Sequence, residues 1–421
     1  MQFRASGLWA NTEFLKLWAA QTISFVGSQI TLLALPLVAV LLVQASPAQM
    51  GILRTAGLAP ALLIGLFVGT LIDRVRRRPI LVVADVGRAL LLGSIPVANH
   101  VGVLSINHLY VVAFLVGVLT VFFDVAHMSL LPTLVQRDQL VDGNSKLEVS
   151  RSVAMIAGPG IAGILIQALT VSVALIIDAV SFIGSALFLL LLRTPESPPA
   201  RSEIRSSFWA DVVEGFRAVW NQPLLRTMAA SLCVFNFFFS MIGTVYVLYL
   251  VRELNITPAA LGLIYAIGSF GFPIGAAFAG RVARRIGVGP TIVWGAGVSD
   301  AAFLLIPLAR GPHVIVVPIL IAAQLLATLA GPMTAINQLG VRQAITPDRL
   351  QGRVNGTMSV IALGAAPVGA LLAGVLGSTI GLHPTLTIGA LGLQLGFVIL
   401  LLSPLRTLRE RPQLHASDQP A

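Results

Sequence analysis

The sequence predicts an all-α membrane protein with twelve transmembrane helices in two parallel six-helix repeats. The composition is 56% hydrophobic and only 10% charged, and its mean hydropathy is +0.90. Soluble domains carry charge on roughly a quarter of their residues, so a soluble enzyme is excluded. At about 20 apolar residues per bilayer crossing, 421 residues accommodate twelve helices and short loops. A membrane β-barrel is excluded because the apolar runs are long and unbroken, whereas barrel strands are short and alternate.

Apolar runs between turn and charge signals place the crossings. In the first half we expect helices at 15–43, 47–72, 79–98, 107–131, 145–169 and 171–192. In the second half we expect them at 224–251, 258–279, 288–309, 313–338, 353–377 and 384–403. The predicted domains are a six-helix bundle over 1–192, a cytoplasmic linker over 193–222, a second bundle over 223–405 and a cytoplasmic tail over 406–421.

The basic residues test this topology, because short loops rich in Lys and Arg stay in the cytoplasm. With both termini in the cytoplasm, nearly all of them fall on the cytoplasmic side, and the exceptions are Arg54, Arg252 and Arg310. The net charge of +10 is therefore a topology signal and does not indicate nucleic-acid binding. We expect a multi-pass protein of the bacterial cytoplasmic (inner) membrane, surrounded by lipid and functional as a monomer.

The linker carries aromatic and aliphatic residues at helical spacing, from Phe208 to Trp220, with charged residues between them. This pattern predicts an amphipathic helix. It is compatible with a helix lying in the cytoplasmic membrane interface and equally with a linker helix packed on the body of the protein.

The two halves of the chain repeat each other at a nearly constant offset. The segment 11–20 matches 221–230, the segment 46–51 matches 257–262, and Asp138-Gln-Leu matches Asp348-Arg-Leu. The basic cluster around Arg77 matches that around Arg284. Six helices per repeat make the halves parallel, the geometry of secondary transporters that bind substrate near the membrane midplane and open alternately to each side.

The loop after the second predicted helix, Gly69-Thr-Leu-Ile-Asp73-Arg74-Val-Arg76-Arg77-Arg78, resembles the cytoplasmic signature of the major facilitator superfamily. The segment with Gly158, Pro159, Gly160 and Gly163 resembles the Gly-Pro motif of proton-coupled exporters in that superfamily. Over nearly the whole chain the sequence is similar to the twelve-helix drug and siderophore exporters, which include macrolide and enterobactin efflux proteins. The usual Gly before the basic pair is Arg76 here, which departs from the signature.

The resemblance implies a gate in which Asp73 closes against the start of the eleventh helix, where a helix N-terminus favours a carboxylate. We assign Gly69, Arg74, Arg77 and Arg78 to the same gate. The alternative is that these arginines only set topology. For the Gly-Pro motif the alternatives are close helix packing and a kink that controls substrate leakage.

Ionisable residues inside the bilayer are functional candidates, because burying a charge there is costly. Asp85, Arg88, Asp124 and Arg151 fall at similar depth and are predicted to form one buried charge network, with Glu148 beside it. Asp124 is the expected proton carrier, since a carboxylate removed from water can exchange protons near neutral pH. The alternative is a permanent pair of Asp124 with Arg88 or Arg151. Asp178 and Asp300 are expected on outer helices, bonded within their own bundle.

The resemblance implies that the first, fourth, seventh and tenth helices line a cavity. Their polar and aromatic residues predict a mainly apolar wall that suits a bulky, largely apolar ligand. The residues assigned to this wall are Ser28, Gln29, Phe123, Asn236, Ser240, Gln324 and Thr328.

The predicted function is export of hydrophobic or amphipathic small molecules by proton antiport. The resemblance implies both the coupling to protons and the outward direction of transport. An importer or facilitator on the same fold is the closest alternative, and a membrane enzyme or sensor is more remote. The two lysines follow no phosphate-binding loop, which excludes an ATP-driven pump. The six histidines show no metal-ligand spacing, so we expect no metal and no cofactor.

Overall fold

The computed structural model describes residues 7–72, 75–193 and 208–410, and in these ranges the chain forms helices and no strand. Asp73 and Arg74 of the predicted gate lie outside the described residues. Twelve helical stretches are long and apolar enough to cross a membrane, as the hydropathy pattern predicts. A helix satisfies its backbone hydrogen bonds within its own segment, so a local run of apolar residues is enough to form each crossing.

The helices of the first half begin within a few residues of the predicted positions. They are α1 (Thr12–Leu41), α2 (Pro47–Ile72), α3 (Arg77–Val101), α4 (Ile106–Met128), the short α5 (Leu131–Leu134), α6 (Leu140–Ala168) and α7 (Val171–Leu190). Several are capped by polar side chains: Asn11 accepts from the amides of Glu13 and Phe14 at the start of α1, and Thr170 accepts from Val173 at the start of α7. Such caps satisfy amides that have no partner inside the helix.

The second half repeats the pattern with two interruptions. Its helices are α8 (Phe208–Asn221), α9 (Pro223–Arg252), α10 (Pro258–Ser269), α11 (Gly271–Ile286), α12 (Val288–Ala302), α13 (Leu305–Leu308), α14 (His313–Ile345), α15 (Asp348–Thr379) and α16 (Leu382–Leu401). The eighth crossing is broken at Phe270 and the ninth at Phe303 and Leu304. The tenth extends to Ile345, seven residues past its predicted end at 338, because polar side chains continue a helix once it leaves the apolar layer.

The chain divides into two compact units. The N-terminal unit comprises Met1–Ala45, Ile52–Glu203 and Ile256–Ala266, and the C-terminal unit comprises Ser46–Gly51, Ile204–Asn255 and Ile267–Ala421. The first residues of α2 thus group with the second half and those of α10 with the first half. The sequence-based boundaries 1–192 and 223–405 stay predictions.

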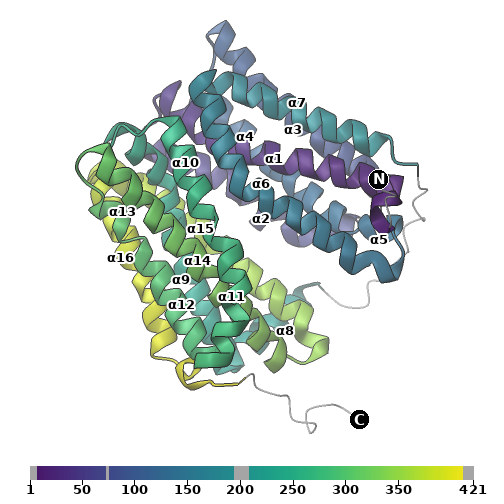
Figure 1. The fold of residues 1–421 in the computed structure, drawn as a ribbon, viewed down its shortest axis with the longest axis vertical. Coiled ribbons are helices and arrows are strands. Elements are labelled where there is room, and N and C mark those ends of the chain that lie inside the picture. Colours follow the sequence, from purple (N-terminus) through teal and green to yellow (C-terminus); the bar gives the residue numbers. More distant parts are fainter. Residues whose placement is uncertain (1–6, 73–74, 194–207, 411–421) are drawn as a thin grey trace, which may run out of the picture. The chain divides into compact units, whose positions relative to one another are not determined.

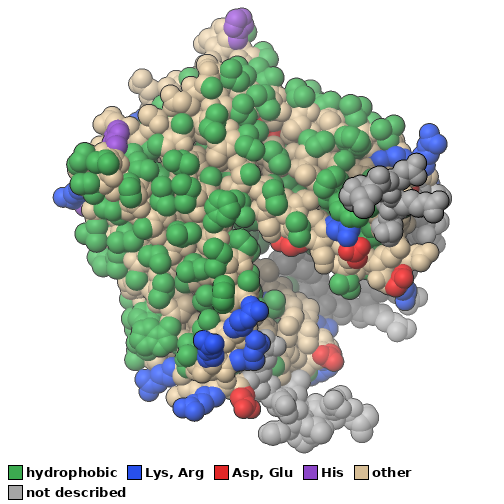
Figure 2. All heavy atoms as spheres, viewed as in Figure 1, with side chains coloured by type: hydrophobic (Ala, Val, Ile, Leu, Met, Phe, Trp, Pro, Cys, Tyr) green, Lys and Arg blue, Asp and Glu red, His purple; other side chains and the backbone are tan. Residues whose placement is uncertain are grey.

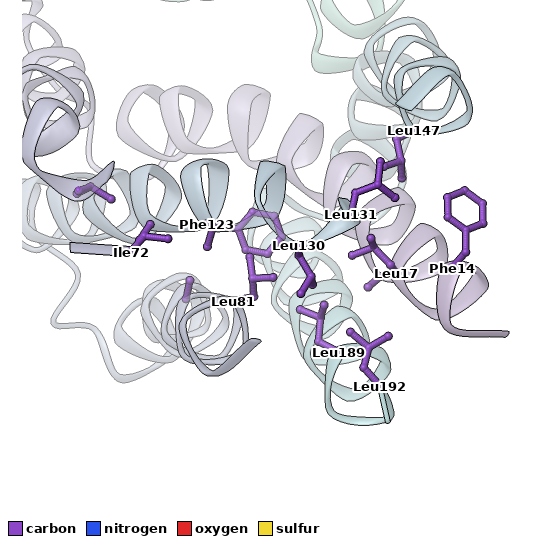
Figure 3. Packing of buried hydrophobic residues seen from close by; sticks show 14 of the residues in the cluster. Phe14, Leu17, Ile72, Leu81, Phe123, Leu130, Leu131, Leu147, Leu189 and Leu192 are labelled. Carbon is purple, nitrogen blue, oxygen red and sulfur yellow. The ribbon is translucent and has the colours of Figure 1, made fainter. Parts of the chain in front are cut away.

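In the N-terminal unit, α1 packs against α6 and α7, and α3 packs against α4 and α7 (Figure 1). One end of this unit holds a buried apolar cluster that joins α1, α3 and α7 to the connection after α4, including Leu17, Leu81, Leu130 and Leu189 (Figure 3). In the C-terminal unit, α9 packs against α15 and α16, and α14 packs against α11 and α12. The view in Figure 2 shows this unit covered by hydrophobic side chains along the helices, with basic side chains gathered at one end, as expected for a surface in lipid.

Paired glycines let helices approach closely at two positions that the repeat relates. In the C-terminal unit, a Cβ on Gly51 would lie 3.0 Å from the Cα of Gly374, and in the N-terminal unit a Cβ on Gly163 would lie 2.8 Å from the Cα of Gly262. Gly51 and Gly262 occupy matching positions in segments 46–51 and 257–262. Only glycine allows backbones to approach this closely. The two repeats therefore share this helix contact as well as a sequence pattern.

The linker helix α8 packs on α15 and α9 of the C-terminal unit. Its Glu214 pairs with Arg349 at 3.0 Å and also with Arg353, both in the first two turns of α15. Phe216 and Trp220 remain exposed, with stacked rings 5.9 Å apart. The described part of α8 is therefore a linker helix packed on the body that presents an aromatic pair on its outer side.

Candidate functional site

The buried charges of the N-terminal unit centre on α3. Asp85 and Arg88 are one turn apart on the same face, are 0% and 3% exposed and form a salt bridge. The Arg88 guanidinium lies between two rings, 4.2 Å from the centroid of Phe123 and 4.4 Å from that of Phe182. A planar cation suits stacking of this kind, which offsets part of the cost of taking the charge out of water.

In the described part of the N-terminal unit, several buried side-chain polar atoms have no hydrogen-bond partner. They include both polar atoms of the Gln21 side chain, Oδ2 of Asp85, Nε of Arg88 and the hydroxyl of Ser185. Gln21 lies on α1 and Ser185 on α7, so unpaired polar groups occur on three helices of this unit. Gln21 and Ser185 were absent from the predicted site, although a glutamine inside an apolar crossing is itself a signal of function or packing.

Asp178 lies deeper in the same unit and is fully buried. It accepts a hydrogen bond from the Thr31 hydroxyl on α1 and another from Ser181 at 3.1 Å. A Cβ on Gly27 would lie 2.2 Å from its Oδ1, so glycine there permits α1 to approach α7. The expectation that Asp178 bonds within its own bundle is confirmed.

Asp124 and Arg151, predicted to share a buried charge network with Asp85 and Arg88, and Glu148, predicted beside it, do not bond to the buried pair in the described structure. Asp124 follows Phe123 on α4, and because successive helical positions point about 100° apart, Phe123 is buried while Asp124 is exposed. Glu148 and Arg151 on α6 are 63% and 55% exposed and pair with each other at 3.8 Å. Asp124 still lies close enough to Arg88, Arg151 and His127 to interact electrostatically.

The Asp124 carboxylate forms no hydrogen bond or ion pair with any described residue. Arg88 is held by Asp85 and Arg151 by Glu148, while the His127 ring approaches the backbone oxygen of Asp124, at 3.3 Å. The alternative of a permanent Asp124 pair with Arg88 or Arg151 is therefore not what the structure contains. Asp124 is thus a carboxylate without a bonded partner among the described residues, and it lies near the charges of Arg88 and Arg151.

Arg78 of the predicted gate has a structural partner in the same unit. Its Nε donates to the Leu189 carbonyl at 2.8 Å, and its Nη2 donates to the Leu190 carbonyl. These carbonyls end α7, where a cation is favoured by the helix dipole. Arg77 begins α3 beside it, and Gly69 lies in α2.

The Gly-Pro motif lies on α6, where its glycines meet α1 and α10. A Cβ on Gly158 would lie 2.4 Å from the Cβ of Gln29, and one on Gly160 would lie 3.1 Å from that of Ala266. The carbonyl of Pro159 would lie 2.5 Å from a Cβ on Gly262. These contacts account for the glycines through close helix packing.

The predicted cavity residues separate into two groups. Phe123 is 3% exposed and covers Arg88, and Ser240 is 1% exposed inside the C-terminal unit. Their assignment to a cavity wall stays a prediction. The others are half-buried: Ser28, Gln29, Asn236, Gln324 and Thr328. Whether such a side chain is buried or half-buried depends on how its helix is rotated about its own axis. An apolar crossing specifies that rotation only weakly.

Comparison with known proteins identifies the fold and the family. The sequence model of the Major Facilitator Superfamily matches residues 17–308 and again 228–420. The chain belongs to this superfamily. The crystal structure of the nucleoside transporter NupG superposes with a TM-score of 0.75 at 11% identity, covering 92% of this chain and 98% of that one. A bacterial homologue of the iron transporter ferroportin, in its inward-facing state, gives 0.74 at 16% identity, with coverage of 92% and 98%.

Sequence relatives of this superfamily member include exporters. The multidrug efflux pump Tap of Mycolicibacterium fortuitum is 31% identical over 398 residues, which cover 91% of this chain and 93% of Tap. The enterobactin exporter EntS of Salmonella typhi is 26% identical over 361 residues, with coverage of 84% and 83%. This superfamily member is a multi-pass membrane transporter of small molecules and not an enzyme.

Proposed function

We propose that this transporter exports hydrophobic or amphipathic small molecules, of the drug, macrolide or siderophore class, in exchange for protons and by alternating access. Full-length similarity to Tap and EntS supports export. The observation that carries the proton-coupling proposal is the exposed and unpaired Asp124 carboxylate beside the buried Asp85–Arg88 pair. We place the protein in the bacterial inner membrane as a monomer with cytoplasmic termini.

The electrostatics of the N-terminal unit connect a proton on Asp124 to its interior. Arg88 interacts with the charges of Asp85, Asp124 and Asp178. Protonation of Asp124 removes one of these three negative charges and so changes the electrostatic energy of Arg88. Proton uptake and release at Asp124 therefore changes the electrostatic energy of the buried Arg88, as proton coupling requires.

The remaining predicted residues take supporting roles in this proposal. Gly69, Asp73, Arg74, Arg77 and Arg78 form the cytoplasmic gate. The Gly-Pro motif on α6 limits leakage, and the half-buried polar residues of the first, seventh and tenth crossings contact the substrate.

The test is efflux of fluorescent dyes, macrolides and siderophores from cells that express the protein, with and without a proton ionophore. We expect efflux of at least one compound, its loss when the ionophore is added, and its loss in Asp124→Asn at unchanged expression. Asp142→Asn is the matched control, because Asp142 is half exposed and pairs only with Lys146 on the same helix.

Undiminished efflux by Asp124→Asn would remove this residue from the mechanism. Accumulation of the compound in place of efflux would show that the transporter is an importer.

A further inference from the structure

A small cavity in the C-terminal unit contains a carboxylate that the proposed export mechanism does not use. Its volume is about 140 Å³, and side chains of α9, α12 and α14 line it; α12 and α14 run side by side in Figure 1. Asp300 of α12 faces this cavity and is 3% exposed. Pockets for drug-sized ligands measure roughly 300–1,000 Å³, so this cavity is too small for such a substrate.

Asp300 has no partner in the part of the chain that the structure describes. No cation pairs with it and no donor bonds to it, which contradicts the expectation that it hydrogen-bonds within its bundle. The other strongly buried carboxylates, Asp85 and Asp178, are both compensated. Burying a carboxylate alone is so costly that the group is neutralised by a proton, by a paired charge or by a metal ion.

Four polar side chains line the cavity beside Asp300. Gln338 can present either its amide oxygen or its NH₂ group, and the other three are hydroxyls. The hydroxyl of Ser231 donates to the Gly396 carbonyl at 3.2 Å, that of Ser299 to the Ala327 carbonyl at 3.3 Å, and that of Thr334 to the Ile292 carbonyl at 3.2 Å. A hydroxyl has one hydrogen to donate, so these three present only acceptor oxygens to the cavity. A pocket of acceptors around a carboxylate favours a cation.

The backbone beside Asp300 adds to the negative potential. The ninth crossing is interrupted directly after α12, which ends at Ala302, and Asp300 lies in its last turn. The carbonyl end of a helix carries a partial negative charge. Interrupted helices in membrane transporters place such ends beside bound Na⁺. Here the carbonyls of Asp300 and Ala301 accept from the amides of Phe303 and Leu304, so only the helix end itself contributes.

We propose that the Asp300 cavity is a binding site for a monovalent metal cation, with Na⁺ as the ion that tests it. One carboxylate neutralises one positive charge, whereas a divalent ion would leave a net charge buried among apolar side chains. Ser231, Ser299 and Thr334 supply the neutral oxygen ligands, and the remaining volume accommodates water, at about 30 Å³ per molecule.

The test measures binding on the purified full-length protein, so its result does not depend on export. Saturable binding of ²²Na⁺ is measured at constant pH and ionic strength, with N-methyl-D-glucamine as the replacing cation, alongside the thermal unfolding midpoint. We expect one Na⁺ per chain and a midpoint that rises with Na⁺. Asp300→Asn should abolish both effects, Ser299→Ala should weaken binding roughly tenfold, and Asp142→Asn should change neither.

Absence of saturable Na⁺ binding in the wild-type protein overturns the proposal, as does binding that Asp300→Asn retains. Proton uptake that Asp300→Asn abolishes, without Na⁺ binding in the wild type, also overturns it, because the carboxylate is then neutralised by a proton. If Asp300→Asn does not fold, the wild-type measurement and the comparison of Ser299→Ala with Asp142→Asn decide.

Discussion

At the residue scale, the position of Arg88 explains why a charge is tolerated inside the N-terminal unit. Its salt bridge to Asp85 and its two ring contacts compensate a cation that is 3% exposed. The pair was predictable, because Asp85 and Arg88 are three residues apart on one helix and such side chains meet. The role of Phe123 was not predictable, since it depends on how α4 is rotated toward α3.

Removing the Arg88 charge should destabilise the protein strongly. Arg88→Met leaves Asp85 buried without its cation, and breaking one half of a buried pair costs about 3–5 kcal/mol. The thermal unfolding midpoint should therefore fall, measured on protein purified in detergent.

The control for Arg88 is Arg151→Met, which breaks an exposed pair worth about 0–1 kcal/mol. A midpoint for Arg88→Met as high as that of Arg151→Met would show that the pair does not stabilise the fold.

At the element scale, helices pack closely through glycine at two positions that the sequence repeat relates to each other. The pairs Gly51–Gly374 and Gly163–Gly262 each place backbone against backbone. A Gly-Pro motif in the sequence indicates close packing but does not identify the partner helix. The structure identifies α1 as the partner of Gly158 and α10 as the partner of Gly163.

An added methyl group at this contact should separate the two helices. In Gly163→Ala the new Cβ would meet the Pro258 carbonyl at 2.6 Å, a backbone atom that cannot rotate away. We expect a lower unfolding midpoint and impaired transport. Gly356→Ala is the matched control on α15, because its Cβ would meet nothing within 4 Å and alanine gains up to about 1 kcal/mol in a helix interior. Equal midpoints in the two variants would contradict the packing role.

The attachment of α8 gives a second prediction at this scale. A Cβ on Gly215 would lie 2.6 Å from the Arg353 carbonyl, so Gly215→Leu should lift α8 from α15 and weaken both Glu214 ion pairs. Amide hydrogen exchange in α8 should become faster, while exchange in α16 stays unchanged as the internal reference. Unchanged exchange in α8 would mean that its docking does not depend on this contact.

At the scale of the whole molecule, the distribution of charge predicts how the chain enters the membrane. The basic side chains gather at helix ends on one side of the topology, as positive-inside insertion requires. Cys233 is the single cysteine of the sequence, so Cys233→Ser provides a background without thiols.

In that background a cysteine at Gln44, in the exposed turn after α1, should react with a membrane-impermeant maleimide applied to intact cells. A cysteine at Arg76, exposed before α3, should react only after the cells are opened. The reverse pattern would invert the topology, and reaction of both sites in intact cells would contradict the twelve-helix arrangement.

The sequence by itself determined the number of crossings, the duplication, the family and the residues that carry charge inside the bilayer. These features are local, because lipid forces each crossing to bond its own backbone and to consist of apolar residues. The tertiary structure alone decided that Phe123 covers Arg88, that Asp124 is exposed and unpaired among the described residues, and that Asp300 faces a small cavity with three hydroxyl side chains. These depend on the rotation and contact of helices far apart in the chain, and an almost uniformly apolar helix surface leaves that rotation to packing.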